Sequence, residues 1–332
     1  MLKVGKLDSD LLKEIVFDKI TFRRPEVRTR PGIGEDCAVV DFGEYDAVMS
    51  TDPITAAVTD IGRLCIHISS NDIASNGVQP VGILLIVLLP EGTTEDEIAE
   101  MMSQAAEVSE ELGVEIIGGH TEITRAVRQP VITSTAIGRA PAGGSQTADD
   151  IRPGDFIIMT KRAGIEGTGI VARDLADELK EFMTAEEIAK AQDLLKEVSV
   201  VKEGVIAGAI GTHGMHDVTE GGVLGAVWEM CHIAGVGCEV WQDEIPVEDV
   251  TLKICSHYGA DWLRMISSGC MMIAAAPDKK EEIMDAIHGA GIGAACIGRI
   301  TEKGGDLVIR SGGETRPVDP PSSDEIYRIV GR

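Results

Sequence analysis

Short apolar runs of strand length alternate with segments of helical periodicity along the whole chain, and this alternation restricts the fold more than any other feature. In the first half the strand-like runs lie at residues 37–42, 46–52, 81–89, 114–117 and 131–137. Apolar residues recur at helical spacing in residues 8–20, 63–77 and 94–112. Such an order predicts a mixed fold of the α/β or α+β class.

A stretch rich in turn-forming residues divides the chain near its middle. It runs from Pro141 to Gly154 and is built mainly from Pro, Gly, Ala, Ser and Asp, a composition that favours turns and linkers. The alternation then resumes, with strands expected at residues 155–161, 237–241, 270–276, 294–300 and 307–310 and helices expected within 167–210 and at 278–290. We therefore predict two domains, residues 1–140 and 153–332, joined by a linker at 141–152.

The overall charge limits the partners of the chain. Its 55 acidic and 30 basic residues give a formal net charge of −25 at pH 7, and no dense cluster of Lys and Arg in the sequence offsets it. Such a chain repels nucleic-acid phosphates and anionic lipids at long range, so we expect neither nucleic acid nor membrane as a partner. An anionic small-molecule substrate would need a divalent cation to shield its charge.

The seven cysteines form no C-x-x-C pair and mostly stand in apolar surroundings. This pattern is typical of reduced core residues in a cytoplasmic protein. The N-terminus lacks the pattern of a secretory signal, and the longest apolar run, Val81 to Leu89, is too short to span a bilayer. We therefore expect a cytoplasmic location.

Acidic residues stand at or within several apolar patterns. Asp36 precedes one strand-like run, Asp52 ends another, and Asp72 follows Asn71 inside a helical pattern. Burial of unpaired carboxylates is costly, and hard divalent cations with oxygen ligands relieve that cost. Any one of these residues alone could be a solvated turn residue. Taken together with a further acidic motif in the second half, they predict a magnesium site formed by Asp36, Asp52, Asp72 and Asp217.

Two glycine pairs near expected strands and helices can expose backbone N–H groups to a phosphate. Gly118-Gly119 directly follows the run 114–117, although an ordinary strand-to-loop turn would explain this pair as well. Gly221-Gly222 follows an acid and a hydroxyl at the start of an expected helix, where N–H donors can face an anion. The second pair is therefore the stronger indication of a phosphate site.

His213, His216 and Asp217 fall close together and also resemble a transition-metal site. No cysteine or further histidine completes that set, and Gly214 interrupts helical spacing, so loop histidines near a phosphate site are the simpler interpretation. The motifs G-x-x-x-x-G-K-[ST] and G-x-G-x-x-G do not occur in the sequence. Nucleotide binding would therefore have to come from the acidic motifs.

The motifs, taken in order, resemble the aminoimidazole ribonucleotide (AIR) synthetase-like superfamily. This PurM-like group includes that purine enzyme, thiamine-monophosphate kinase, selenophosphate synthetase and the hydrogenase-maturation protein HypE. The resemblance extends over nearly the whole chain. It rests on the segments 34–39, 50–52, 60–62, 71–74, 118–121, 217–222 and 267–269.

The resemblance implies a fold, a dimer and a reaction. Two N-terminal four-stranded sheets would form a barrel across a homodimer, with a C-terminal α/β domain beside them. ATP and Mg²⁺ would lie in a cleft between the domains, and ATP would phosphorylate an oxygen or a similar nucleophile of a small-molecule substrate.

The resemblance also implies roles for individual residues. Asp36, Asp72 and Asp217 would hold Mg²⁺, and Asp52 would bind the metal or ATP. The nucleotide-binding residues that it implies are Asp52, Gly118, Gly119, His120, Thr121, Thr219, Gly221 and Gly222.

Departures from the family pattern bear on the subfamily. Glu35 replaces the first of two aspartates common in the family, and His120 stands where thiamine-monophosphate kinases and HypE have Asp. The spacing of the motifs looks nearest to HypE, but the chain ends in Ile329-Val330-Gly331-Arg332 without the C-terminal cysteine of that group. We therefore expect a HypE-like, ATP-dependent enzyme whose substrate the sequence does not identify.

Two alternatives stay open at this point. One is an ATP-binding regulatory or assembly protein that acts on a maturation partner protein without turnover. The other is a phosphoribosylformylglycinamidine cyclo-ligase. The sequence assigns no catalytic residue and leaves the roles of Glu35, Cys37 and His120 open.

Overall fold

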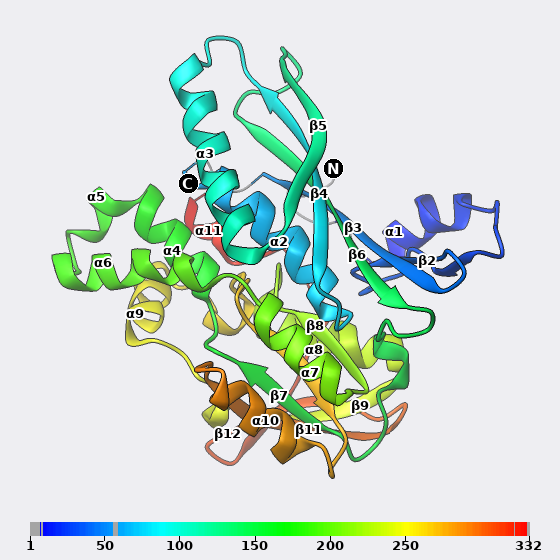
Figure 1. Cartoon of the computed structure of the whole chain (residues 1–332). Coiled ribbons are helices and arrows are strands. Elements are labelled where there is room, and N and C mark those ends of the chain that lie inside the picture. Colours follow the sequence, from blue (N-terminus) through cyan, green and yellow to red (C-terminus); the bar gives the residue numbers. More distant parts are fainter. Residues whose placement is uncertain (1–6, 8, 56–58, 322, 331–332) are drawn as a thin grey trace.

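The structure is a computed structural model that describes residues 7, 9–55, 59–321 and 323–330. In these residues the chain forms two β-sheets with helices packed against them, the first sheet from the first half of the chain and the second from the second half (Figure 1). The expectation of a mixed α/β fold is confirmed.

The first sheet has six strands in the order β1-β2-β3-β6-β4-β5. In that order the strands are Val27–Thr29, Ala38–Asp41, Tyr45–Ile54, Val131–Pro141, Pro80–Leu89 and Glu115–Ile123. Neighbours are antiparallel except β4 and β5, which are parallel. The sheet is open in this chain, and it has six strands instead of four because β1 and β5 extend its two edges.

Helix α2 (Ile61–Ser75) lies between the first sheet and the second half of the chain (Figure 1). It packs on β3, β6 and α3 (Glu95–Leu112) and also contacts α7 (Val201–Ile210) and β8 (Gly214–Asp217). Every residue of α2 except Arg63 is buried. Polar residues on this helix must therefore find partners inside the protein.

The expected helix at 94–112 begins with a capping box. Glu97 N–H donates to Thr94 Oγ1 at 3.3 Å, and Thr94 N–H donates to the Glu97 carboxylate at 2.7 Å. The helix ends at Gly113, whose φ of 65° is left-handed.

Helix α1 (Ser9–Ile15) is drawn near the label of β2, on the right of Figure 1. The helix expected at 8–20 consists of α1 and a 3-10 turn, η1 (Phe17–Lys19). Residue 8 lies outside the described residues.

The second sheet has seven strands in the order β13-β12-β9-β11-β7-β10-β8. In that order the strands are Glu314–Pro317, Leu307–Ser311, Val236–Trp241, Ala294–Lys303, Phe156–Thr160, Met271–Ala275 and Gly214–Asp217. Only β12 and β9 are parallel. Strands β8 and β13, at the two edges, were not expected from the sequence.

Helices surround this second sheet. Besides α7 they are α4 (Ile165–Asp174), α5 (Ala176–Leu179), α6 (Ala185–Asp193), α8 (Gly222–Ala234), α9 (Asp249–Tyr258), α10 (Lys280–Gly289) and α11 (Ile326–Val330). Short 3-10 turns are η2 (Ala148–Asp150), η3 (Leu194–Glu197), η4 (Gln242–Glu244) and η5 (Trp262–Arg264). No helix among the described residues is long and apolar enough to cross a membrane.

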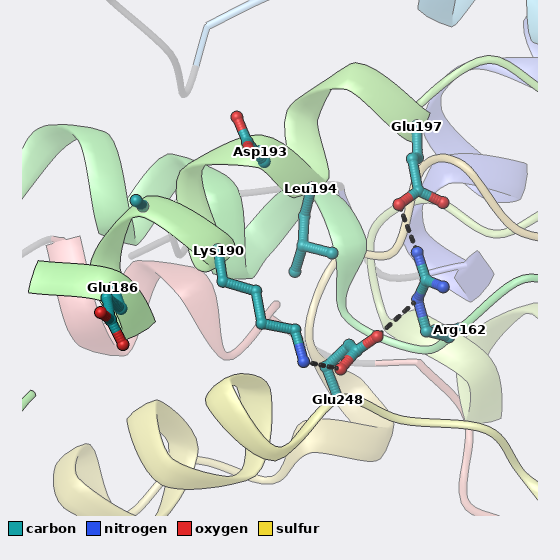
Figure 2. A pocket seen from close by; sticks show the side chains of 8 residues that line it. Arg162, Glu186, Lys190, Asp193, Leu194, Glu197 and Glu248 are labelled. Carbon is teal, nitrogen blue, oxygen red and sulfur yellow. Dashed lines mark hydrogen bonds and ion pairs between the residues drawn. The ribbon is translucent and has the colours of Figure 1, made fainter. Parts of the chain in front are cut away.

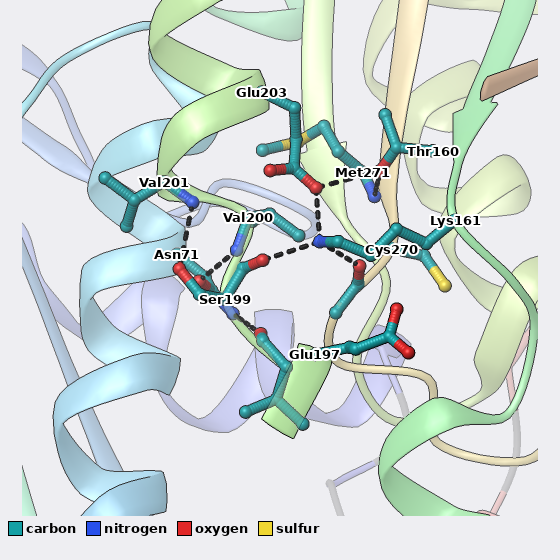
Figure 3. A network of polar contacts seen from close by, with 12 residues as sticks. Asn71, Thr160, Lys161, Glu197, Ser199, Val200, Val201, Glu203, Cys270 and Met271 are labelled. Carbon is teal, nitrogen blue, oxygen red and sulfur yellow. Dashed lines mark hydrogen bonds and ion pairs between the residues drawn. The ribbon is translucent and has the colours of Figure 1, made fainter. Parts of the chain in front are cut away.

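The two halves share an apolar core and a polar bridge. One cluster of buried residues extends from Cys37 in the first half to Ile329 in the second, and its largest buried side chains are Ile, Leu and Met. On α2, Asn71 Nδ2 donates to the Val198 carbonyl and Asn71 Oδ1 accepts from Val200 N–H, both at 2.8 Å (Figure 3). This bridge fixes α2 on the second half.

A partly buried lysine, Lys161, extends the bridge. The Lys161 ammonium donates to the carbonyls of Ser199 at 2.6 Å and Gly269 at 2.9 Å, and it pairs with Glu203 (Figure 3). The Glu203 side chain is 1% exposed, so the lysine compensates a charge that would otherwise be buried alone. The turn that holds Asn71 is therefore itself held by the second sheet.

Candidate metal and nucleotide site

Four carboxylates predicted from the sequence meet in one cluster. Asp36 precedes β2, Asp52 lies in β3, Asp72 in α2 and Asp217 at the end of β8. All four influence the Cys37 thiol, which lies among them. The structure thus brings together the residues of the predicted magnesium site, and their role as ligands stays a prediction.

Asp72 lies in surroundings that strongly disfavour its ionised form. Burial raises its pKa well above the usual value, and the negative charges of Asp217 and Asp52 raise it further. The Ser50 hydroxyl donates to Asp72 Oδ2 at 2.5 Å. A carboxyl group in such surroundings becomes ionised when a cation provides the opposite charge.

His216 connects the cluster to α8. Its Nδ1 lies 2.6 Å from Asp36 Oδ2, and its Nε2 lies 3.0 Å from Glu229 Oε2. Burial alone would lower the pKa of His216, but the carboxylates of Asp36 and Glu229 outweigh it and raise the pKa well above its usual value. The two carboxylates therefore favour the positively charged form of the ring. Asp36 uses Oδ2 for this contact and for the Ser75 hydroxyl at 3.2 Å, which leaves Oδ1 for another ligand.

The expected loop position of His216 is wrong, because this residue lies in strand β8 and is buried. Among the described residues, Asp36, His216 and Asp217 form the group of His, Cys, Asp or Glu side chains whose potential ligand atoms all lie within 4.8 Å of one another. Both ring nitrogens of His216 are occupied by carboxylates, and His213 contacts Asp155 at 2.8 Å instead. Neither histidine is therefore available as a ligand in this structure, which argues against a transition-metal site.

Two residues of open role, Cys37 and Glu35, lie next to Asp36. The Cys37 thiol donates to the Asp72 carbonyl at 3.1 Å, and burial together with the nearby acids raises its pKa well above the usual value. Such surroundings disfavour the reactive thiolate form. Burial raises the pKa of Glu35 to about 7, and the charges of Asp149 and Asp36 contribute.

The first glycine motif does not join the cluster within one chain. Gly118, Gly119, His120 and Thr121 lie in the exposed edge strand β5, and His120 contacts Glu122 at 3.3 Å. The register places Asp52 opposite Ser134, Ser134 opposite Leu85, and Leu85 opposite Gly119. Three strand spacings correspond to about 14 Å. These four residues therefore lie away from the acidic cluster of their own chain.

The backbone explains the glycines in β5. Gly118 and Gly119 have φ values of 152° and 151°, and a Cβ at Gly119 would lie 1.9 Å from the Leu85 carbonyl oxygen. The strand continues where the sequence suggested a loop, because glycine can adopt backbone angles that residues with a Cβ cannot adopt here.

The second glycine motif lies at the start of α8, close to Asp217. Gly221 N–H donates to Asp324 Oδ2 at 2.7 Å, and Gly222 N–H donates to the Thr219 carbonyl at 3.1 Å. Both donors are therefore engaged within the chain and do not face an anion in this structure. Phosphate binding by Thr219, Gly221 and Gly222 stays a prediction.

Sequence reasoning missed the side chains that hold the acids in place. For two of them the sequence held an indication. Ser50 precedes Asp52 by two residues in a strand and Ser75 follows Asp72 by one helical turn, and both spacings place the two residues on the same face of their element. Glu229, in the middle of α8, carried none, because only the packing of α8 against β8 places it at His216.

A separate pocket of about 510 Å³ lies on the surface of the second half (Figure 2). Its charged residues pair with one another: Arg162 contacts Glu197 and lies 3.2 Å from Glu248, and Lys190 lies 2.6 Å from Glu248. None of the predicted site residues lines it. Its two basic residues are thus engaged by acids of the same pocket, and with Glu186 and Asp193 also in the lining its four acidic residues outnumber them.

A two-sheet fold in which both halves contribute carboxylates to one buried centre defines a class of proteins suited to divalent cations. Models of AIR synthase related proteins match this chain in two parts, the N-terminal domain over residues 34–140 and the C-terminal domain over residues 152–310. The chain belongs to the AIR synthase-related family.

Hydrogenase maturation proteins are among its relatives. A hydrogenase expression/formation protein of Methanocaldococcus jannaschii is 28% identical over 98% of this chain and 97% of its own length. Carbamoyl dehydratase HypE of Rhizobium leguminosarum bv. viciae is 29% identical over 85% of this chain and 82% of its own length.

Solved structures share the fold. The HypE–HypF complex matches with a TM-score of 0.75 at 21% identity, covering 94% of this chain and 99% of the matched chain. HypE in complex with ATP matches with a TM-score of 0.73 at 22% identity, covering 98% and 97%. The PurM-like fold is therefore confirmed.

Proposed function

We propose that this chain is an ATP- and Mg²⁺-dependent enzyme that transfers the γ-phosphoryl group of ATP to a carbonyl or amide oxygen, or a similar nucleophile, of a small substrate. The convergence of Asp36, Asp52, Asp72 and Asp217 in one cluster carries the proposal. Phosphoryl transfer depends mainly on positioning and on neutralisation of phosphate charge.

The residues present fit Mg²⁺. They offer carboxylate oxygens, the ligands that this ion prefers, and Asp36 and Asp52 are only partly buried, so that phosphate oxygens and water can complete the coordination. When bound there, Mg²⁺ would neutralise charge on the phosphate oxygens. Burial and the neighbouring acids raise the pKa of Asp72, so a cation bound beside it would favour its ionised form.

Residues of the chain hold the reacting groups in place. In the transfer, the substrate oxygen bonds to the γ-phosphorus, the bond to the β–γ bridging oxygen breaks, and ADP leaves with that electron pair. The contacts of Asp36 with His216, and of Asp72 with Ser50, fix both carboxylates before a ligand arrives. The positive charge of His216 also reduces repulsion among the acids.

The relatives support the reaction class. HypE is a carbamoyl dehydratase and has been solved with ATP, and its complex with HypF supports a maturation partner protein for this chain. A homodimer is part of the proposal, supported by the exposed apolar side chains of β4 and β5. A cytoplasmic location is also part of the proposal. It is supported by the seven cysteines, which all lie in the described part of the chain and form no disulfide there.

Calorimetry with ATP in the presence and absence of Mg²⁺ tests the proposal. We expect Mg²⁺-dependent ATP binding that Asp72→Asn weakens, because this variant removes a charge from the centre of the cluster. Release of phosphate should increase with amide- or carbonyl-bearing substrates. Failure of the natural chain to bind ATP with Mg²⁺ would contradict the proposal.

The same measurements separate the alternatives. An assembly protein without turnover would bind ATP but release no phosphate in response to any substrate, and Asp72→Asn would change only its binding or its complex with the partner protein. A cyclo-ligase would respond to formylglycinamidine ribonucleotide. Neither alternative is favoured by a specific contact in the structure.

A further inference from the structure

A cavity of about 470 Å³ lies between the N-terminal segment and the C-terminal end of α8. The residues that matter for its chemistry are Lys13, Arg23, Arg30, Glu35, His232 and Ile233. We call it the arginine pocket. Its volume suits a small organic molecule.

The arginine pocket adjoins the acidic cluster. Glu35, in its wall, directly precedes Asp36 in the chain. Gly34 packs so closely on α8 that a Cβ there would lie 2.8 Å from Ile233 Cδ1 and 3.2 Å from Glu229 Cβ. Because Ile233 lines the pocket and Glu229 holds His216, one helix forms a wall of both. A molecule in the pocket would therefore have one end beside the cluster.

The pocket is lined by three basic side chains, Lys13, Arg23 and Arg30, and by two acidic ones, Asp18 and Glu35. The guanidinium of Arg23 donates to the carbonyls of Ile20 and Phe22, and that of Arg30 donates to the carbonyl of Arg24 at 3.0 Å. Neither forms an ion pair with a described residue, whereas Lys13 is paired with Asp18 at 3.0 Å.

Arg24 provides the contrast. It lies between the two pocket arginines in the sequence, but its guanidinium is held by both oxygens of Glu26, at 3.0 and 2.7 Å, and it does not line the pocket. The chain as a whole has a net charge of −25. A pocket with two guanidinium groups that form no ion pair with a described residue therefore contrasts with the acidic character of the chain.

We propose that the arginine pocket binds the anionic end of the substrate, a small molecule with a carboxylate or phosphate at one end and the oxygen to be phosphorylated at the other. This inference rests on the function proposed above. The planar guanidinium group binds both kinds of oxyanion through paired hydrogen bonds. The negative charge of the rest of the chain favours this location over other surfaces.

Three small probes test the pocket on the full chain. Succinamate carries an amide and a carboxylate, phosphonoacetamide an amide and a phosphonate, and succinamide two amides without charge. Saturation-transfer NMR titrations should detect binding of an anionic probe and not of succinamide. Arg30→Ala and Arg23→Ala should each weaken that binding about tenfold or more, and Arg24→Ala should leave it unchanged.

A second variant and a second ligand complete the test. Arg30→Lys keeps the charge and should weaken binding less than Arg30→Ala, provided that both unfold at the temperature of the natural chain. Calorimetric affinity for ATP with Mg²⁺ should be the same in Arg30→Ala and Arg24→Ala.

The outcomes are distinct. Preference for phosphonoacetamide or for succinamate would support the proposal and identify the anion as phosphate-like or carboxylate. Equal binding of the anionic probes by Arg30→Ala and Arg24→Ala would overturn it. So would loss of ATP affinity in Arg30→Ala with unchanged probe binding, since the arginine would then serve the nucleotide. A natural chain that binds the probes but not ATP would contradict the proposed function only.

Discussion

Among single residues, Glu229 has the clearest indirect influence on the acidic cluster. It holds the ring of His216, which in turn holds Asp36. Residues in such a position tune the affinity of a metal site through the ligand that they orient.

Glu229→Gln should therefore weaken the Mg²⁺ dependence of ATP binding about tenfold. Glutamine can still accept a hydrogen bond from His216 but does not stabilise its positive charge. The measurement is a Mg²⁺ titration of ATP affinity by calorimetry. Glu111→Gln, which removes an exposed charge from α3, is the control, and equal Mg²⁺ dependence of the two variants would contradict the role of Glu229.

Glu166, in the first turn of α4, gives a pH-dependent prediction. Burial raises its pKa from 4.5 to about 7, although hydrogen bonding to Ser268 acts in the opposite direction. Between these pH values the unfolded chain releases the proton and the folded chain keeps it. The free energy of unfolding therefore falls as the pH rises through this window and stays lower above it.

Glu166→Gln removes this dependence. Relative to the natural chain, the variant should gain up to about 3 kcal/mol of stability between about pH 4.5 and about pH 8. Urea unfolding at both pH values measures the gain. The matched control is Glu95→Gln, an exposed acid in the first turn of α3. A gain no larger than that of the control would show that Glu166 titrates normally.

At the level of helices and strands, α2 is the element on which the site depends most. It carries Asp72 toward the acids and Asn71 toward the second half, and the two backbone partners of Asn71 are buried beside it. Adjacent residues of one helix thus have separate tasks, one electrostatic and one structural.

Asn71→Ala should lower the free energy of unfolding by roughly 3 kcal/mol, because it leaves the Val198 carbonyl and the Val200 N–H without partners. ATP affinity should fall as well, since the position of Asp72 is less constrained. Denaturant unfolding measures the first effect and calorimetry the second. Gln79→Ala, which removes an exposed amide that contacts the Leu112 carbonyl at 3.2 Å, should cost less than about 0.5 kcal/mol. Similar losses in both variants would argue against the bridge.

The elements that the sequence predicted well are those with strong periodicity or chemical end signals. The helix at 94–112 has both its cap and its terminal glycine, and the runs at 46–52 and 81–89 are strands. Strand β8 was missed because its four residues, Gly214–Asp217, include two polar ones that only burial against β10 makes strand-like.

The candidate site likewise contains residues whose placement the sequence could predict and residues whose placement it could not. The acids were predictable because each stands out against an apolar pattern, and the structure places Asp36, Asp52, Asp72 and Asp217 together. The separation of Gly118–Thr121 from them was not predictable, because it depends on strand order in the sheet. Strand order arises from contacts far apart in the sequence, which periodicity does not record.

On the scale of the whole molecule, the outer strands of the first sheet present an apolar surface. Val81, Ile86, Ile117 and Ile123 are 56%, 45%, 50% and 50% exposed, and one backbone edge of β5 has no neighbouring strand among the described residues. Surfaces of this kind mark interfaces between subunits. They support the expected homodimer.

The double variant Ile86→Lys/Ile117→Lys should therefore be monomeric at concentrations where the natural chain sediments as a dimer. Charges placed on both strands make burial of that face unfavourable. Phe22→Lys is the control, because Phe22 is apolar and 81% exposed but lies in the N-terminal segment. A dimer that survives the double substitution, or a natural chain that is monomeric, would contradict this interface.

The acidic centre takes Asp36, Asp52 and Asp72 from the first half of the chain and His216 and Asp217 from the second. Proteolysis in the connection at 141–152 would thus yield two fragments that each hold an incomplete set of ligands. A bound metal–nucleotide complex would therefore add to the apolar core that the two halves share, and nicked protein should resist dissociation by denaturant better when it is saturated with the ligand than without it.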